Sequence, residues 1–154
     1  VNNEAETEKK YYKGFIYTND LATWDKNQFV TIIGRKDDMI ISSGENIYPT
    51  EVEAVLNTHA KVKDCIVTSV PDKIRGQIVT AYIVPVASIE EAEHGLAEEL
   101  DEFCKESNEI ANFKRPRYYR FVSQIPFNAT GKKLHVKIKE IASRDQKNGL
   151  LYRV

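Results

Sequence analysis

A lysine follows a glycine in a polar loop near the C-terminal end of the chain, and a lysine in such a position can bind phosphate. Residues 128–133 read Asn-Ala-Thr-Gly-Lys-Lys, so the candidate is Lys132. A phosphate-cradling P-loop would need a glycine five positions before Gly131, where Pro126 stands, and a serine or threonine after Lys132. A P-loop is therefore excluded, and a lysine in a turn is, taken alone, usually a solvated surface charge.

Three further short motifs contain charged residues or glycine and are candidates for a functional site. Residues 34–38 read Gly-Arg-Lys-Asp-Asp, residues 19–20 read Asn-Asp, and residues 42–45 read Ser-Ser-Gly-Glu. Each motif is also typical of an ordinary turn, because short acidic side chains cap turns and glycine permits a bend. None of them indicates a function by itself.

Apolar periodicity and turn residues predict the elements that must position these motifs. The expected strands are residues 15–18 and 29–33, both part of one antiparallel sheet, a hairpin over 39–48, and strands 62–70, 78–86 and 118–122. The expected helices are residues 49–59, an apolar stripe over 89–104 that follows the N-cap Ser88 and is weakened at Gly95, and residues 134–142. This order predicts an α+β fold, a small mixed domain of short β-sheets packed with helices.

Composition and charge exclude several classes of protein. The 22 basic and 23 acidic residues are interspersed, which speaks against a nucleic-acid binder or a polybasic membrane anchor. No apolar run approaches the ~20 residues of a transmembrane helix. Cys65 and Cys104 lie far apart and have no ligand spacing with the histidines, so neither a metal site nor a disulfide is expected. Two free thiols suit a reducing compartment, so we expect a soluble protein in the cytoplasm.

The order and spacing of the motifs resemble those of the adenylate-forming (AMP-binding) enzyme superfamily, which includes acyl-CoA ligases, peptide-synthetase adenylation domains and luciferases. Four motifs follow in family order, at residues 17–21, 34–40, 43–53 and 126–132. The resemblance implies that residues 37–154 are the mobile C-terminal domain of such an enzyme. Residues 1–36 would be a short β tail, the C-terminal edge of a large N-terminal adenylating domain.

The resemblance also implies a role for each matching residue. Asp20 would bind the ribose hydroxyls of ATP, since a carboxylate can accept two hydrogen bonds, and Arg35 would contact the nucleotide. Asp37 would be the hinge about which the C-terminal domain rotates. Lys132 would approach the α-phosphate and the substrate carboxylate during adenylation, where negative charge is crowded.

Three positions depart from the family pattern. The family usually has glycine before the ribose-binding aspartate, where this chain has Asn19, a residue that tolerates left-handed backbone. A hydrophobic residue commonly follows the lysine, with a basic residue two positions beyond, and here Lys133 and His135 stand at those positions.

After adenylation, the implied rotation brings the bend at residues 42–45 beside the adenylate. Ser43, Gly44 and Glu45 would then line the pantetheine tunnel of coenzyme A, and a side chain at Gly44 would obstruct the thiol arm. Arg75 matches a basic position that contacts CoA phosphates in some acyl-CoA ligases, although an exposed loop arginine without a ligand is an equal alternative.

The implied function is that of an AMP-forming acyl-CoA ligase that uses ATP with Mg²⁺ and coenzyme A as substrates. The Mg²⁺ site and the acyl pocket would belong to the N-terminal domain, the partner of this fragment, so the fragment alone would be inactive. Residues 43–49 are more similar to fatty- and aryl-CoA ligases than to peptide-synthetase domains, which suggests fatty acid metabolism. Two alternatives stay open, an adenylation domain that loads a carrier protein and a non-catalytic module that binds CoA or a partner. The sequence does not determine the carboxylic acid or the oligomeric state.

Overall fold

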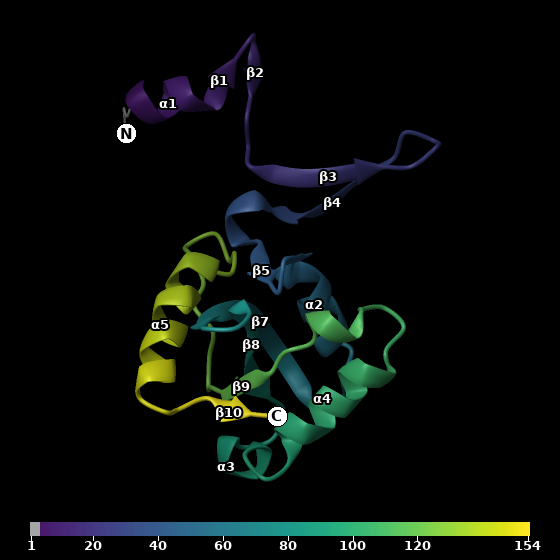
Figure 1. Ribbon diagram of the computed structural model, residues 1–154, viewed down its shortest axis with the longest axis vertical. Coiled ribbons are helices and arrows are strands. Elements are labelled where there is room, and N and C mark those ends of the chain that lie inside the picture. Colours follow the sequence, from purple (N-terminus) through teal and green to yellow (C-terminus); the bar gives the residue numbers. More distant parts are fainter. Residues whose placement is uncertain (1–3) are drawn as a thin grey trace. The chain divides into compact units, whose positions relative to one another are not determined.

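The computed structural model describes residues 4–154, and the chain divides into two compact units, Val1–Asp37 and Asp38–Val154 (Figure 1). The helices are α1 (Glu4–Lys10), α2 (Pro49–Leu56), α3 (Ile89–Ala92), α4 (Leu96–Glu106) and α5 (His135–Lys147), with 3-10 turns η1 (Lys36–Asp38) and η2 (Asn112–Lys114). The strands are β1 (Tyr11–Tyr12), β2 (Phe15–Ile16), β3 (Asp20–Trp24), β4 (Val30–Arg35), β5 (Ile40–Ser42), β6 (Glu45–Ile47), β7 (Val62–Asp72), β8 (Gly76–Pro85), β9 (Tyr118–Phe121) and β10 (Tyr152–Arg153). Within residues 4–154, no helix is both long and apolar enough to cross a membrane.

The described strands of the first unit form two separate hairpins after α1, so the prediction that residues 15–18 and 29–33 belong to one sheet is wrong. β2 pairs with β1 because Lys13 and Gly14, with φ of 50° and 83°, make a two-residue turn that suits a tight hairpin. β4 pairs instead with β3, a strand that the sequence did not predict. Aspartate and alanine, which are depleted in strands, conceal β3 in the sequence.

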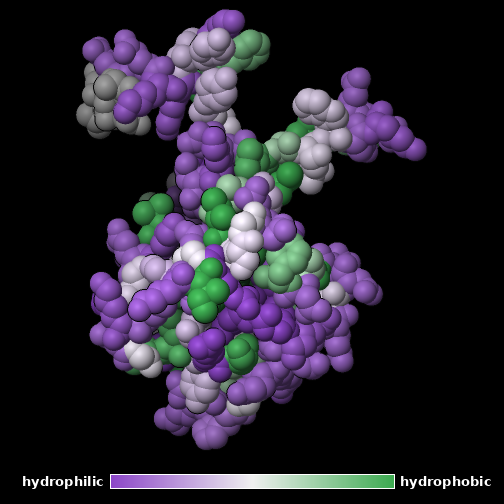
Figure 2. All heavy atoms as spheres, in the orientation of Figure 1, coloured by the Kyte–Doolittle hydropathy of each residue, from purple (hydrophilic) through white to green (hydrophobic). Residues whose placement is uncertain are grey.

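Large apolar side chains of the first unit are exposed. Phe15 is 75% exposed and Trp24 is 77% exposed, and Figure 2 shows apolar surface along β3 and β4. An isolated two-stranded hairpin is at best marginally stable in water, and exposed apolar patches mark interaction surfaces. The first unit therefore leaves large apolar side chains on its surface that it does not bury itself.

The second unit is built on a mixed sheet of six strands within the described residues. β7 and β8 form a long antiparallel hairpin, which confirms the two strands predicted there. β9 lies parallel to β8, with α3 and α4 in the crossover that a parallel pair requires. β10 pairs with the free side of β9, and β5 meets β8 at Ser42 and Gly76.

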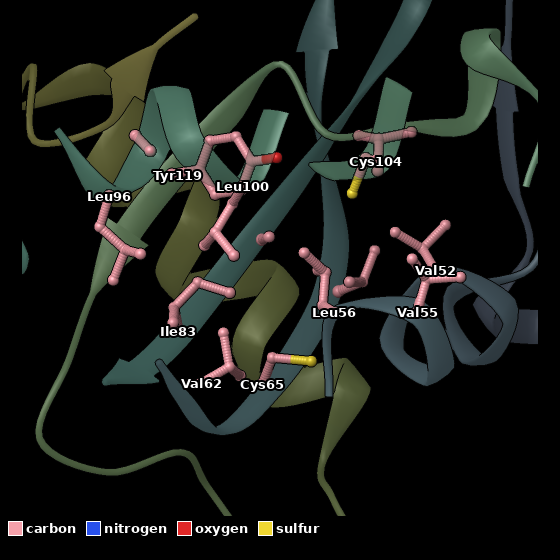
Figure 3. Close-up of a cluster of buried hydrophobic side chains, with 14 of the residues drawn as sticks. Val52, Val55, Leu56, Val62, Cys65, Ile83, Leu96, Leu100, Cys104 and Tyr119 are labelled. Carbon is pink, nitrogen blue, oxygen red and sulfur yellow. The ribbon is translucent and has the colours of Figure 1, made fainter. Parts of the chain in front are cut away.

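Helices cover both faces of this sheet, so the α+β prediction is confirmed. Cys65 and Val67 of β7 belong to the core cluster that contains α2 and α4 (Figure 3). The intervening Ile66 belongs to a second cluster, which contains Ile138 of α5. Successive residues of a strand point to opposite faces, which explains why β7 and β8 are almost continuously apolar.

The local predictions for the second unit are mostly confirmed. β5 and β6 form the expected hairpin, with Ser43 and Gly44 at its turn, and α2 begins at Pro49. The stripe over 89–104 is split into α3 and α4 at Gly95, whose φ is 95°. The Ser88 side chain caps α3 by accepting a hydrogen bond from the Glu91 amide at 3.3 Å.

The last helix is longer than predicted. It was expected to end at residue 142, but α5 extends to Lys147. Asp145, in the added turn, accepts a hydrogen bond of 2.9 Å from the buried hydroxyl of Tyr82. A contact between residues 63 positions apart leaves no periodic signal in the sequence.

Candidate functional site

Lys132 lies in a short loop that is held by its own hydrogen bonds. A β-bridge between Phe127 and Lys133 closes the loop. The Asn128 side chain accepts hydrogen bonds from the amides of Thr130 at 3.0 Å and Lys132 at 2.8 Å, and the Asn128 amide donates to the Lys132 carbonyl at 2.9 Å. The Lys132 side chain is exposed, and its ammonium has no partner among the described residues of its unit. The loop therefore presents a free cation on an ordered backbone.

The two residues that depart from the family pattern after Lys132 point inward. Lys133 binds Asp64 at the start of β7, and His135 binds Glu53 of α2. Burial by itself lowers the pKa of His135, but the hydrogen bond and charge of Glu53, together with the charge of Asp38, outweigh burial and the opposing charge of Lys133. The result is a His135 pKa raised above its usual 6.5. Both positions thus anchor the loop to the body of the unit.

The three residues predicted for nucleotide binding and the hinge lie together. The pairing of β3 with β4 places Asp20 opposite Arg35, with Oδ1 of Asp20 3.6 Å from Nη1 of Arg35. Nη2 of Arg35 lies 3.3 Å from Oδ2 of Asp37, which also accepts a hydrogen bond of 3.0 Å from the Asn19 amide group. These side chains are roughly half exposed, which leaves carboxylate oxygens open to a ligand.

Asn19 has the left-handed backbone that a glycine would adopt easily. Its φ is 64°, and asparagine is among the non-glycine residues most often found there. The turn before Asp20 therefore survives the departure from the family pattern. The asparagine also supplies a donor to Asp37 that a glycine could not supply.

The candidate residues for a thiol substrate also lie together. The Ser43 amide donates to the Arg75 carbonyl at 2.9 Å, which places the β5–β6 turn beside the β7–β8 turn. Asp72 fixes that second turn, because its Oδ1 accepts hydrogen bonds from the amides of Ile74 at 2.9 Å and Arg75 at 2.7 Å. Gly44 has φ of 85°, and no heavy atom lies within 4 Å of the position of an added Cβ. The constraint on Gly44 inside this unit is therefore its backbone conformation and not lack of space.

Arg117 is a further candidate for binding an anion, and the sequence analysis did not identify it. Its Nε is buried without a hydrogen-bond partner in the described part of the chain. Burial lowers the pKa of Arg117, and the neighbouring charges of Arg115 and Arg75 lower it further, against the opposing charge of Asp101. Arg115 is ion-paired with Asp101 at 3.3 Å, whereas Arg117 and Arg75 form no salt bridge among the described residues. The run Lys-Arg-Pro-Arg at residues 114–117 was the signal in the sequence.

The structure separates the candidates of the second unit into two places. Lys133 ties the Lys132 loop to Asp64 near the start of β7, whereas Asp72 at its end holds the turn beside Ser43. Eight residues of extended strand span about 26 Å. Among residues 4–154, no three histidine, cysteine, aspartate or glutamate side chains are grouped so that they could hold a metal ion.

Comparison with known proteins gives consistent matches. The AMP-binding enzyme C-terminal domain family matches residues 51–132, more than half of the chain. The 2-succinylbenzoate–CoA ligase of Bacillus licheniformis is 39% identical over 138 residues, which are 90% of this chain and 27% of that enzyme. The mitochondrial medium-chain acyl-CoA ligase ACSF2 of Macaca fascicularis is 39% identical over 141 residues, which are 92% of this chain and 21% of that enzyme.

A solved structure also matches. It is the o-succinylbenzoate CoA synthetase from Bacillus subtilis in complex with the acyl-adenylate intermediate, with a TM-score of 0.79 and 36% identity over 90% of this chain and 27% of that chain. This chain spans about a quarter of the length of the relatives it matches.

Proposed function

Because the chain belongs to the AMP-binding enzymes and carries their C-terminal domain, we propose that it is part of an AMP-forming acyl-CoA ligase. The family predicted from the order of the motifs is thereby confirmed. In the proposed reaction, a carboxylate attacks the α-phosphate of ATP to give an acyl-adenylate and pyrophosphate. The thiol of coenzyme A then displaces AMP to give the thioester.

The observation that carries the proposal is the exposed ammonium of Lys132, which has no partner in the described part of its unit, on an ordered loop. Negative charge accumulates when one oxyanion attacks phosphorus, and a fixed cation stabilises that charge without reorganising during the reaction. The loop hydrogen bonds of Asn128 hold the backbone of Lys132 in place while leaving its side chain free. We therefore assign Lys132 to the adenylation step.

The exposed cluster of Asp20, Arg35 and Asp37 is our proposed nucleotide site and hinge. The partly exposed carboxylate of Asp20 can accept hydrogen bonds from ribose hydroxyls beside its ion pair with Arg35, and Arg35 can bridge the nucleotide and the hinge aspartate. The division between the two compact units falls directly after Asp37, which supports a hinge there. We assign residues 1–36 to the edge of the N-terminal domain and 37–154 to the mobile domain, and the exposed apolar surface of the hairpins supports the first assignment.

We assign the turn of Ser43, Gly44 and Glu45 to the thiol step. All three residues are exposed, and the Arg75 turn lies beside them. Neither Arg75 nor Arg117 forms a salt bridge within the described residues, although Asp72 acts on the first and Asp101 on the second, and two guanidinium groups suit the phosphates of coenzyme A. The lysine loop and this turn are anchored at opposite ends of β7, so a rotation at Asp37 would present them to one active site in succession.

The remaining assignments concern the whole enzyme. We propose that ATP binds together with Mg²⁺ and that the Mg²⁺ site lies in the N-terminal domain. We also propose that the carboxylic acid binds there, so fatty and aromatic acids both remain candidates. A cytoplasmic location is supported by Cys65 and Cys104, which are buried free thiols.

The proposal is tested on the full-length enzyme with a panel of acids that includes 2-succinylbenzoate and medium-chain fatty acids. Acid-dependent exchange of pyrophosphate into ATP measures adenylation, and acid-dependent loss of free CoA thiol measures the second step. We expect both activities with one acid class. Adenylation followed by transfer to a phosphopantetheinylated carrier protein, with no transfer to CoA, would favour the carrier-loading alternative. CoA binding without any adenylation would favour the binding module.

A further inference from the structure

An ion pair of Lys133 and a histidine–carboxylate contact of His135 hold the segment that follows Lys132, and the proposed mechanism makes no use of them. The Lys133 ammonium lies 2.7 Å from Oδ1 of Asp64 and donates to the Cys65 carbonyl at 2.6 Å. Nε2 of His135 lies 2.9 Å from Oε1 of Glu53. The side chains of Lys133 and His135 are 22% and 17% exposed, so both face the body of the unit.

The acceptors of these two pairs are themselves fixed by backbone hydrogen bonds. Oε1 of Glu53 also accepts a hydrogen bond of 2.8 Å from the Val67 amide, which ties α2 to β7. Oδ1 of Asp64 accepts one of 2.8 Å from the Cys65 amide. The two carboxylates are therefore held in place by α2 and β7, and the Lys133 and His135 side chains bind to preorganised partners.

Fixing Lys133 inward decides where Lys132 points. The segment is extended here, because Lys133 bridges to Phe127 and the Leu134 amide donates to the Pro126 carbonyl at 2.9 Å. Neighbouring side chains of an extended segment point to opposite sides. With Lys133 on Asp64, Lys132 must face outward, and a slip of one residue would exchange the two lysines.

We propose that Lys133 and His135 are positioning residues for Lys132, which set the register and direction of the loop through Asp64 and Glu53. This inference rests on the proposed function, since it concerns the adenylation step. A misplacement of 1 Å in a reacting group can cost about 100-fold in rate. The thiol step uses the opposite end of β7, so loss of the anchors should spare it.

The experiment compares variants of the full-length enzyme in the two half-reactions. Lys133→Met removes one anchor while keeping the length of the side chain, and Asp64→Asn removes the same ion pair with a smaller change in packing. We expect the rate of pyrophosphate exchange to fall by about 10- to 100-fold in both variants. Thioester formation from preformed acyl-adenylate should stay within about twofold of wild type, since the anchors act only on the lysine loop.

Two further variants separate positioning from general stability. Lys133→Arg keeps the charge and can pair with Asp64, so it should restore most of the adenylation rate. Lys61→Met removes an ion pair of 2.6 Å with Glu99 on another part of the unit and should leave both half-reactions unchanged. Hydrogen exchange in the full-length protein should show faster exchange of the amides of residues 128–134 in Lys133→Met, with β7 and β8 unaltered.

The outcomes distinguish this inference from the proposed function. If wild type forms acyl-adenylate and Lys133→Met does so at the same rate, the anchors do not position Lys132. Equal losses in both half-reactions would assign Lys133 to stability alone and also overturn the inference. If wild type forms no acyl-adenylate with any acid, the proposed function itself is refuted, and the catalytic role of the anchors falls with it.

Discussion

Replacing Gly44 with leucine tests whether the β5–β6 turn lines the path of the thiol. Within the unit the substitution has one cost, because no heavy atom lies within 4 Å of the added Cβ but the backbone has φ of 85°. A non-glycine residue in the left-handed region costs about 1–2 kcal/mol, which lowers Tm by several degrees without preventing folding. Any larger effect on activity must therefore come from what the side chain meets outside the unit.

Gly149 provides a matched control, since its φ is 68° and an added Cβ there also meets no heavy atom within 4 Å. Gly149→Leu and Gly44→Leu should melt at similar temperatures, and both should exchange pyrophosphate into ATP within about twofold of wild type. Transfer from preformed acyl-adenylate to CoA should fall by about 100-fold or more in Gly44→Leu alone, because the side chain displaces the reacting thiol by more than 1 Å. If both folded variants form the thioester at the same rate, the turn does not line the thiol path.

Further predictions address the other candidates. Lys132→Ala should slow adenylation by about 100- to 1000-fold and spare thioester formation from preformed acyl-adenylate, as measured separately for the two half-reactions; equal losses would make the lysine structural. Asn19→Gly removes one hydrogen bond to Asp37, which is worth about 0.5–1.5 kcal/mol. The conformational equilibrium between the two units, measured by fluorescence energy transfer between a dye on each unit, should therefore change by at most about tenfold. No change would mean that Asn19 does not restrain the hinge. In this chain alone, the amides of residues 4–30 should exchange faster with solvent than those of β7, and comparable protection would contradict the assignment of the hairpins to another domain. Because the pKa of His135 is raised in the folded state, its stabilisation is complete below about pH 6.5 and is lost as pH rises through that raised pKa. The free energy of unfolding, measured with denaturant at a series of pH values above about 6.5, should therefore fall more steeply with pH in wild type than in His135→Gln. Equal slopes would show that His135 does not cause the pH dependence of stability.

Sequence patterns predicted the elements of the second unit well because its strands and helices are long enough to repeat their period. β7 and β8 alternate between two buried faces, and α2 begins at a proline after a glycine bend. The first unit was harder, since β1 and β2 have two residues each and no core of their own. Strands this short carry little periodicity, so turn geometry at Lys13 and Gly14 decided the pairing.

The candidate site was predictable where function depends on a local motif and obscure where it depends on distant contacts. The turn at Gly44 and the loop before Lys132 could be found from a few consecutive residues. The anchors of Lys133 and His135 could not, because Asp64 and Glu53 lie 69 and 82 positions away. The motif pattern marked positions 133 and 135 as departures, and only the fold assigns them partners.

The pairing of β10 with β9 has a practical consequence for protein engineering. Tyr152 and Arg153 cover the outer side of β9, and the Val154 amide donates to the Arg117 carbonyl at 3.2 Å. A variant shortened to residue 149 would expose the backbone of β9, and uncovered strands of this kind recruit strands from other molecules.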